Sequence, residues 1–149
     1  MRDDLPSKLG QTLMLGIRDF QRRLDADLLK RGITGIGKRH REVFLYLGEH
    51  GPSRSVDMAN AAGIRPQSMM TILRELEQMG LVERQTDPED SRAKLVSFTP
   101  KGEELIRELG ISTRTVWDQY GDLVGEAELK TIIGGLQRIL AAGKEQNNA

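Results

Sequence analysis

The chain contains no cysteine, and this absence removes several kinds of chemistry at once. Without thiols there is no disulfide framework, no thiol nucleophile and no oxidant sensing through cysteine. Histidine is scarce as well, since His40 and His50 are its only positions. Neither histidine has the spacing of a metal site or of a nucleophile and its base. We therefore expect the protein to be no enzyme and to hold no metal and no cofactor.

Long apolar runs are also missing. No stretch approaches the ~20 apolar residues of a transmembrane helix, and the N-terminal Met-Arg-Asp-Asp-Leu-Pro lacks the apolar core of a signal peptide. At 149 residues the chain is about one domain long, and its 30% of charged residues suits a helix-rich globular protein. We expect a single cytoplasmic domain over residues 1–149, with no membrane partner.

An excess of positive charge is the third missing feature, because 22 Lys and Arg residues balance 22 Asp and Glu residues. Proteins that bind nucleic acid usually carry a basic footprint. Between Ile64 and Lys101 the basic and acidic residues are equally mixed along the chain. A positive surface on this protein would therefore have to come from the sorting of charges in space.

Apolar residues at helical spacing predict a long first helix. They recur at intervals of three or four residues, which is typical of one continuous apolar stripe on a helix. The stripe consists of Leu9, Leu13, Ile17, Phe20, Leu24 and Leu28. We expect this helix to run from about Pro6 to Lys30 and to need a partner for its apolar side.

The last third of the chain repeats the helical pattern. Its apolar residues predict two helices, with a break at Gly121–Glu126 and a frayed tail over Gly143–Ala149. Together with the first helix, these segments carry more apolar surface than a small core can cover. We therefore expect the helices at about residues 6–31 and 100–142 to form a dimerisation region in a homodimer.

The middle of the chain reads as a helix-turn-helix. A supporting helix is expected at about Lys38–Glu49, and a short helix after Ser55 should end at Gly63, which can adopt the positive φ of a sharp turn. A further helix should run from Pro66 to about Met79. Its apolar positions lie on one side and polar residues on the other, as in a helix that reads DNA.

A β-hairpin is expected directly after this helix. Leu81–Gln85 and Lys94–Phe98 have strand composition, and Thr86–Arg92 between them suits a long, solvated tip. Thr99 and Pro100 then form a strong helix start. The predicted fold class is mainly α with a small β-hairpin wing: a winged helix-turn-helix core at about residues 36–99 plus the terminal dimerisation helices.

These residues resemble the MarR family of bacterial transcription regulators, and the resemblance covers almost the whole chain. The most specific part is the wing, Asp-Pro-Glu-Asp-Ser-Arg-Ala-Lys-Leu-Val at Asp87–Val96, followed by Phe98–Gly102. The start of the reading helix, Ile64–Met69, and its end, Leu76–Val82, are similar to those of the family. The resemblance implies a dimeric DNA-binding regulator.

The reading helix offers candidate contacts to DNA. Gln67 can bind adenine through two hydrogen bonds, and Arg74 can contact guanine or phosphate. Smaller contacts are expected from Ser68, Thr71 and Arg65. The alternative is that these side chains are only the solvated face of an amphipathic helix.

For the wing, the resemblance implies that Arg92 enters the minor groove while Asp90 orients it through a charge-assisted hydrogen bond. Lys94 is expected to add a phosphate contact. The alternative is an ordinary exposed ion pair, which contributes about 0 to 1 kcal/mol.

A dimer of this kind predicts a pseudo-palindromic operator of double-stranded DNA. The family implies a repressor that a small aromatic or phenolic effector releases. Its candidate pocket residues here are Arg18, His40, Phe44, Tyr46 and Trp117. The rival interpretation is a winged-helix module that binds another protein. The operator, the target genes, the effector and the choice between repressor and activator stay open at this stage.

Overall fold

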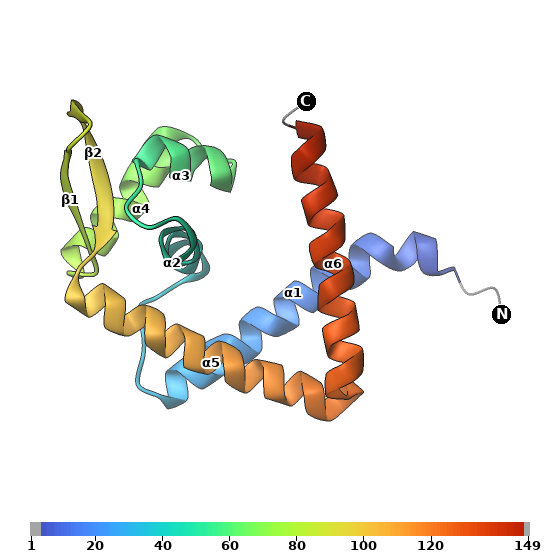
Figure 1. The fold of residues 1–149 in the computed structure, drawn as a ribbon. Helices are drawn as coiled ribbons and strands as arrows, with labels where there is room; N and C mark the ends of the chain where they lie inside the picture. Colours follow the sequence, from blue (N-terminus) through green and yellow to red (C-terminus); the bar gives the residue numbers. More distant parts are fainter. Residues whose placement is uncertain (1–3, 148–149) are drawn as a thin grey trace. The chain divides into compact units, whose positions relative to one another are not determined.

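The computed structural model describes residues 4–147, and in that range the chain forms six helices and one two-stranded antiparallel sheet. The helices are α1 (Leu5–Lys30), α2 (Lys38–His50), α3 (Ser55–Ala62), α4 (Pro66–Gln78), α5 (Pro100–Val124) and α6 (Glu126–Asn147), and the strands are β1 (Val82–Asp87) and β2 (Asp90–Phe98) (Figure 1). The predicted fold class is confirmed. No helix in this range has both the length and the apolarity to cross a membrane.

The chain divides into two compact units. The central unit is Leu28–Ile111 and contains the helix-turn-helix and the hairpin. The terminal unit consists of the chain up to Asp27 and from Ser112 onwards. The sequence predicts a winged core at about residues 36–99 and dimerisation helices at about residues 6–31 and 100–142, and these functional boundaries stay predictions.

The helix-turn-helix forms as the sequence predicts. α3 ends at Gly63, whose φ of 66° is the left-handed conformation that L side chains rarely adopt. α4 then begins with Pro66 after Arg65, whose side chain makes no capping hydrogen bond. The first hydrogen bond of α4 is donated by Met69 N–H to the Arg65 carbonyl at 3.1 Å, so the amides of Gln67 and Ser68 precede the helical bonding.

The core of the central unit lies where the helices and the hairpin meet. Phe44 of α2 is fully buried and stacks on Phe98 of β2, with 5.1 Å between ring centroids. The other buried apolar side chains of this core are Val43, Leu47, Met58, Ala59, Met69, Ile72, Leu73, Leu76, Leu81, Val82 and Val96. Because α4 contributes one whole side to this core, its opposite side is free for other contacts.

The start of α5 closes the base of the hairpin. Thr99 Oγ1 accepts the Gly102 N–H at 3.1 Å, which confirms the predicted helix cap, and it donates to the Gly80 carbonyl at 2.5 Å. A Cβ on Gly102 would lie 2.0 Å from the Leu81 carbonyl oxygen. Glycine is therefore the residue that lets α5 approach the end of the reading helix.

The hairpin tip is shorter than the sequence predicts. Pairing continues through Thr86 opposite Lys94 and, past a bulge, Asp87 opposite Asp90, so only Pro88 and Glu89 lie outside the strands. The prediction of a long tip was wrong because Asp87 is not solvated. Its side chain is 8% exposed and has hydrogen-bond partners within the fold, which allows the strand to extend.

Two boundaries near the C-terminus also differ from the prediction. α5 continues through Gly121, and the break before α6 is Gly125 alone, at a φ of 88°. The frayed tail was wrong for residues 143–147, because α6 continues to Asn147; residues 148–149 lie outside the described range. Helical hydrogen bonding outweighs the local cost of glycine at these positions.

The terminal unit exposes many large apolar side chains in this single chain. In α1 they are Leu5, Leu9, Leu13, Met14, Leu15 and Ile17, and in α5 and α6 of this unit they are Leu123, Val124, Ile132, Ile133, Ile139 and Leu140. A lone chain with this surface fits the expectation of an apolar dimerisation region. The dimer itself remains a prediction.

Candidate nucleic-acid interface

The polar side of α4 is a continuous solvent-facing row. The side chains of Arg65, Gln67, Ser68, Thr71 and Arg74 are all exposed. On the opposite side Met69, Ile72, Leu73 and Leu76 are 0–4% exposed. This separation follows from the 3.6-residue period of the helix, and it leaves every predicted reading residue accessible to a ligand.

Among the reading residues, Thr71 alone has a side-chain hydrogen bond to another residue of the range 4–147. Its hydroxyl donates to the Gln67 carbonyl at 3.1 Å, one helical turn earlier. Thr71 therefore keeps lone pairs to offer as an acceptor, while Gln67 and Arg74 present their donors to solvent.

The wing projects from the central unit as a narrow two-stranded arm (Figure 1). Arg92 and Lys94 of β2 are exposed, and Asp90 is half-buried. The Asp90 carboxylate does bond to Arg92, at 3.0 Å, but through the backbone N–H rather than the guanidinium. The expected hydrogen bond between Asp90 and the Arg92 guanidinium is thus not formed. Asp90 instead bonds the backbone of the turn, and the Arg92 side chain stays exposed.

Four exposed cations of α4 and the wing have no ion-pair partner within residues 4–147. They are Arg65, Arg74, Arg92 and Lys94. The mixture of charges along the chain is thus partly sorted in space. Exposed acids are present too, because Glu83 of β1 and Glu89 of the turn also face solvent.

Several acids of this region are neutralised by partners from other elements. Glu75 Oε1 lies 4.0 Å from Arg39 Nη2, and its Oε2 accepts a hydrogen bond from His40 Nε2 at 2.8 Å. Glu77 Oε1 lies 2.7 Å from Arg84 Nε of β1, an ion pair that lacks the direction of a hydrogen bond. These pairs connect α4 to the neighbouring elements while removing negative charge from the exposed surface.

His40 links the start of α2 to the reading helix. Its Nδ1 accepts the Gly37 N–H at 3.0 Å, so its Nε2 carries the proton that is donated to Glu75. The histidine thereby bonds the amide of the N-cap residue Gly37, as the third helical residue does in a capping box, while Gly37 has no side chain to bond the first amides of α2. This role uses both ring nitrogens of a residue that the sequence interpretation placed in an effector pocket.

Asp87 at the end of β1 is held from two sides. Its Oδ2 accepts Arg54 Nε at 3.0 Å and Arg54 Nη2 at 2.7 Å, and its Oδ1 accepts the Glu89 N–H at 2.9 Å. The backbone bond from Glu89 and the Arg54 guanidinium both lower the pKa of Asp87, and the carboxylate raises the pKa of Arg54. Asp87 is therefore a buried, fully bonded carboxylate.

Sequence reasoning missed Arg54, Glu77 and Arg84 as members of this region. The bond from Asp87 to Glu89 had a signal, because an aspartate before proline in a turn commonly accepts the amide two residues on. The contact with Arg54 had none, since its partner is 33 positions away and no local pattern connects them.

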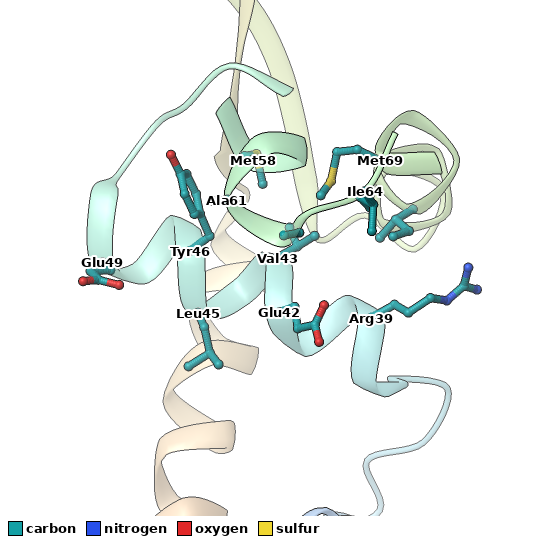
Figure 2. A pocket seen from close by; sticks show the side chains of 12 residues that line it. Arg39, Glu42, Val43, Leu45, Tyr46, Glu49, Met58, Ala61, Ile64 and Met69 are labelled. Atoms are coloured by element: carbon teal, nitrogen blue, oxygen red, sulfur yellow. The ribbon is translucent and has the colours of Figure 1, made fainter. Parts of the chain in front are cut away.

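The candidate effector residues lie in different surroundings. Phe44 is a core residue against Phe98. Tyr46 stacks on His50, with 4.1 Å between ring centroids, and lines a pocket of about 350 Å³ between α2, α3 and α4. Figure 2 shows Met58 and Met69 above Val43 in this pocket. Of the five predicted residues, only Tyr46 lines it.

Arg18 and Trp117 belong to the terminal unit, whereas His40, Phe44 and Tyr46 belong to the central unit. Both residues of the terminal unit have intermediate or greater exposure, with Arg18 exposed and Trp117 half-buried. An effector pocket that all five residues share therefore remains a prediction.

Comparison with known proteins agrees with this geometry. Residues 42–94, from α2 into β2, match the model described as MarR family. The transcriptional regulator PA4135 is 25% identical, with a TM-score of 0.74, over 89% of this chain and 96% of its own.

Two further solved structures were determined with ligands. The transcriptional repressor CouR, bound to a 23-mer DNA duplex, is 20% identical with a TM-score of 0.77, over 94% of this chain and 97% of its own. NadR, in complex with 4-hydroxyphenylacetate, is 24% identical with a TM-score of 0.69, over 88% of this chain and 91% of its own. At these identities the likeness is one of fold.

Proposed function

Because residues 42–94 match the MarR family model and the chain shares its fold with solved transcription regulators, we propose that this protein binds DNA sequence-specifically as a homodimer and regulates transcription. The observation that carries the proposal is the exposed row on α4 beside the free wing cations. Gln67, Ser68, Thr71 and Arg74 face solvent on α4, and so does Arg65 just before it. Arg92 and Lys94 face solvent on β2.

Each part of this surface has a separate task. The first turns of α4 lie in the major groove, where base pairs present distinguishable donors and acceptors. Gln67 reads adenine and Arg74 binds guanine or phosphate, while Arg65, Ser68 and Thr71 position the helix. Arg92 enters the minor groove, whose negative potential is strongest in narrow A·T-rich tracts.

The two copies associate through the apolar side chains of the terminal unit. A two-fold dimer then reads a pseudo-palindromic operator whose half-sites lie about one helical turn, ~34 Å, apart. Binding over a promoter makes the protein a repressor. The exposed Leu9 and Leu13 of α1 and Ile139 and Leu140 of α6 support burial against a second copy.

Selection of bound fragments from random duplex DNA tests this proposal. We expect an enriched pseudo-palindrome, and footprinting should protect two half-sites. Gln67→Ala should relax the preference at one adenine position in each half-site, by about 1–3 kcal/mol. Failure to enrich any sequence at low salt would overturn the proposal. So would a footprint of a single half-site together with a monomer in sedimentation.

A small aromatic or phenolic acid is the proposed effector. It favours a dimer whose reading helices no longer match the spacing of the grooves, so the DNA is released by a shift in population. Because NadR was solved with 4-hydroxyphenylacetate, this compound is a suitable first probe. The compound should weaken the binding of the wild-type protein to its operator, and it should weaken the binding of Trp117→Ala or Arg18→Ala less. Equal weakening for all three proteins would exclude a role of Arg18 and Trp117 in effector binding.

The rival interpretation is a winged-helix module that binds another protein. It predicts the same fold but no preference for any DNA sequence. The same enrichment experiment separates the two, since such a module yields no common sequence. The family and the solved structures of this fold contain transcription regulators rather than enzymes, which supports a binding function for the exposed surface.

A further inference from the structure

The segment between α2 and α3 contacts the wing through two neighbouring residues, Ser53 and Arg54. Ser53 pairs with Val96 of β2 through two backbone hydrogen bonds, of 3.0 Å from Ser53 N–H and 2.8 Å from Val96 N–H. The next residue, Arg54, reaches Asp87 at the far end of β1 through Nε and Nη2. One short segment therefore holds both the base of the hairpin and its turn.

The contact between Arg54 and Asp87 stabilises the turn of the wing. An isolated two-stranded hairpin is marginally stable in water, and the turn of this one extends past α3 and α4 (Figure 1). Arg54 is also the residue before α3, and its carbonyl accepts the N–H groups of Asp57 and Met58. The guanidinium therefore connects the turn of the wing to the first turn of the helix-turn-helix.

We propose that Arg54 and Asp87 are positioning residues, which set the angle of the wing and thereby the selectivity of Arg92 for the shape of the minor groove. This inference rests on the proposed DNA-binding function. In this arrangement Arg54 Nε and Nη2 both donate to one carboxylate oxygen of Asp87. Its effect passes through Asp87, whose other oxygen fixes the turn at Glu89.

The rival role for Arg54 is a direct phosphate contact, for which its partial exposure of 38% leaves room. The two roles differ in their salt dependence. Loss of a phosphate contact lowers the slope of log K against log salt by about 0.9 per arginine. Loss of a positioning contact lowers affinity and selectivity but leaves that slope unchanged.

The test uses the full-length protein, its selected operator and two families of operator variants. One family changes the flanks that the wing contacts from A·T to G·C, and the other changes the bases that α4 reads. Arg54→Ala should reduce the discrimination among flank variants about tenfold and keep the discrimination among α4 variants. Arg107→Ala, a change of another exposed arginine on α5, should alter neither.

A double-mutant cycle identifies the partner. If Arg54 acts through Asp87, the combination of Arg54→Ala with Asp87→Asn should weaken flank discrimination no more than the stronger single variant. Additive losses, an unchanged flank preference in Arg54→Ala, or a fall in the salt slope of that variant would each overturn the proposal.

Hydrogen exchange without DNA keeps this inference distinguishable from the proposed function. In Arg54→Ala the amides of Glu89 and of the strand ends near it should exchange faster, while those of α4 should not change. If the wild type selects no DNA, the regulatory function fails, and the exchange result still decides whether the contact holds the wing. Unchanged exchange at Glu89 would sink the positioning role by itself.

Discussion

Replacing Arg92 with alanine should separate DNA binding from folding. The Arg92 side chain is exposed and has no ion-pair partner within residues 4–147, and its one hydrogen bond in the turn is made by the backbone N–H. Alanine keeps that backbone N–H, and the substitution removes no ion pair of the folded protein within residues 4–147. We therefore expect the free energy of unfolding to change by no more than about 0.5 kcal/mol.

The effect on DNA binding should be much larger. An arginine that reads a groove contributes about 1–3 kcal/mol, and a dimer loses one at each wing. The total of about 2–6 kcal/mol corresponds, at about 1.4 kcal/mol per tenfold change, to a dissociation constant at least about 30-fold higher. Neutralising two charges should also reduce the salt slope by about 1.8.

Fluorescence anisotropy with the selected operator at several salt concentrations measures both quantities, and thermal unfolding followed by circular dichroism measures stability. Arg107→Ala is the matched control, since it removes an exposed arginine outside α4 and the wing and should change neither quantity. An unchanged dissociation constant for Arg92→Ala would refute the role of the wing. A loss of affinity that comes with a lower melting temperature would show that the residue acts on the fold instead.

Three predictions concern the fold itself. Phe44→Ala removes a fully buried ring and should lower the free energy of unfolding by about 3–5 kcal/mol in urea titrations; a loss below about 1 kcal/mol would contradict its place in the core. Gly102→Ala places a Cβ 2.0 Å from the Leu81 carbonyl oxygen, so it should destabilise the protein by about 1–3 kcal/mol, and a neutral result would rule out that close approach. Hydrogen bonds from Arg23 and Tyr120 lower the pKa of Asp19 to about 2 from 3.8, so the stability it supplies is present above pH 3.8 and is lost as the pH falls through 2. Asp19→Asn should remove about 1 kcal/mol at neutral pH, because the carboxylate is partly screened by solvent, and should flatten the acid limb of the stability curve; an acid limb as steep as that of the wild type would contradict the assignment.

Local chemistry in the sequence determined most of the secondary structure. The helical period of Met69, Leu73 and Leu76 predicted which side of α4 is buried, and these residues are 0–3% exposed. Gly63 predicted a turn that needs a positive φ, and Thr99 predicted a helix cap. Such features depend on residues a few positions apart, so a single sequence contains the information.

The polar side of α4 was predictable for the same reason, whereas the expected bond from the Arg92 guanidinium to Asp90 is made by the Arg92 backbone N–H instead. A residue's side of a helix or strand follows from its position in the period. The sequence also carried the resemblance that names the family, and the match over residues 42–94 agrees with it.

Only the tertiary structure decided how the wing is held. The length of its turn depends on the burial of Asp87, and that burial depends on Arg54, 33 positions earlier in the chain. The connection of α2 to α4 through His40 and Glu75 spans 35 positions. Such contacts form when packing brings distant segments together, and no local period or turn preference determines which distant side chains will meet.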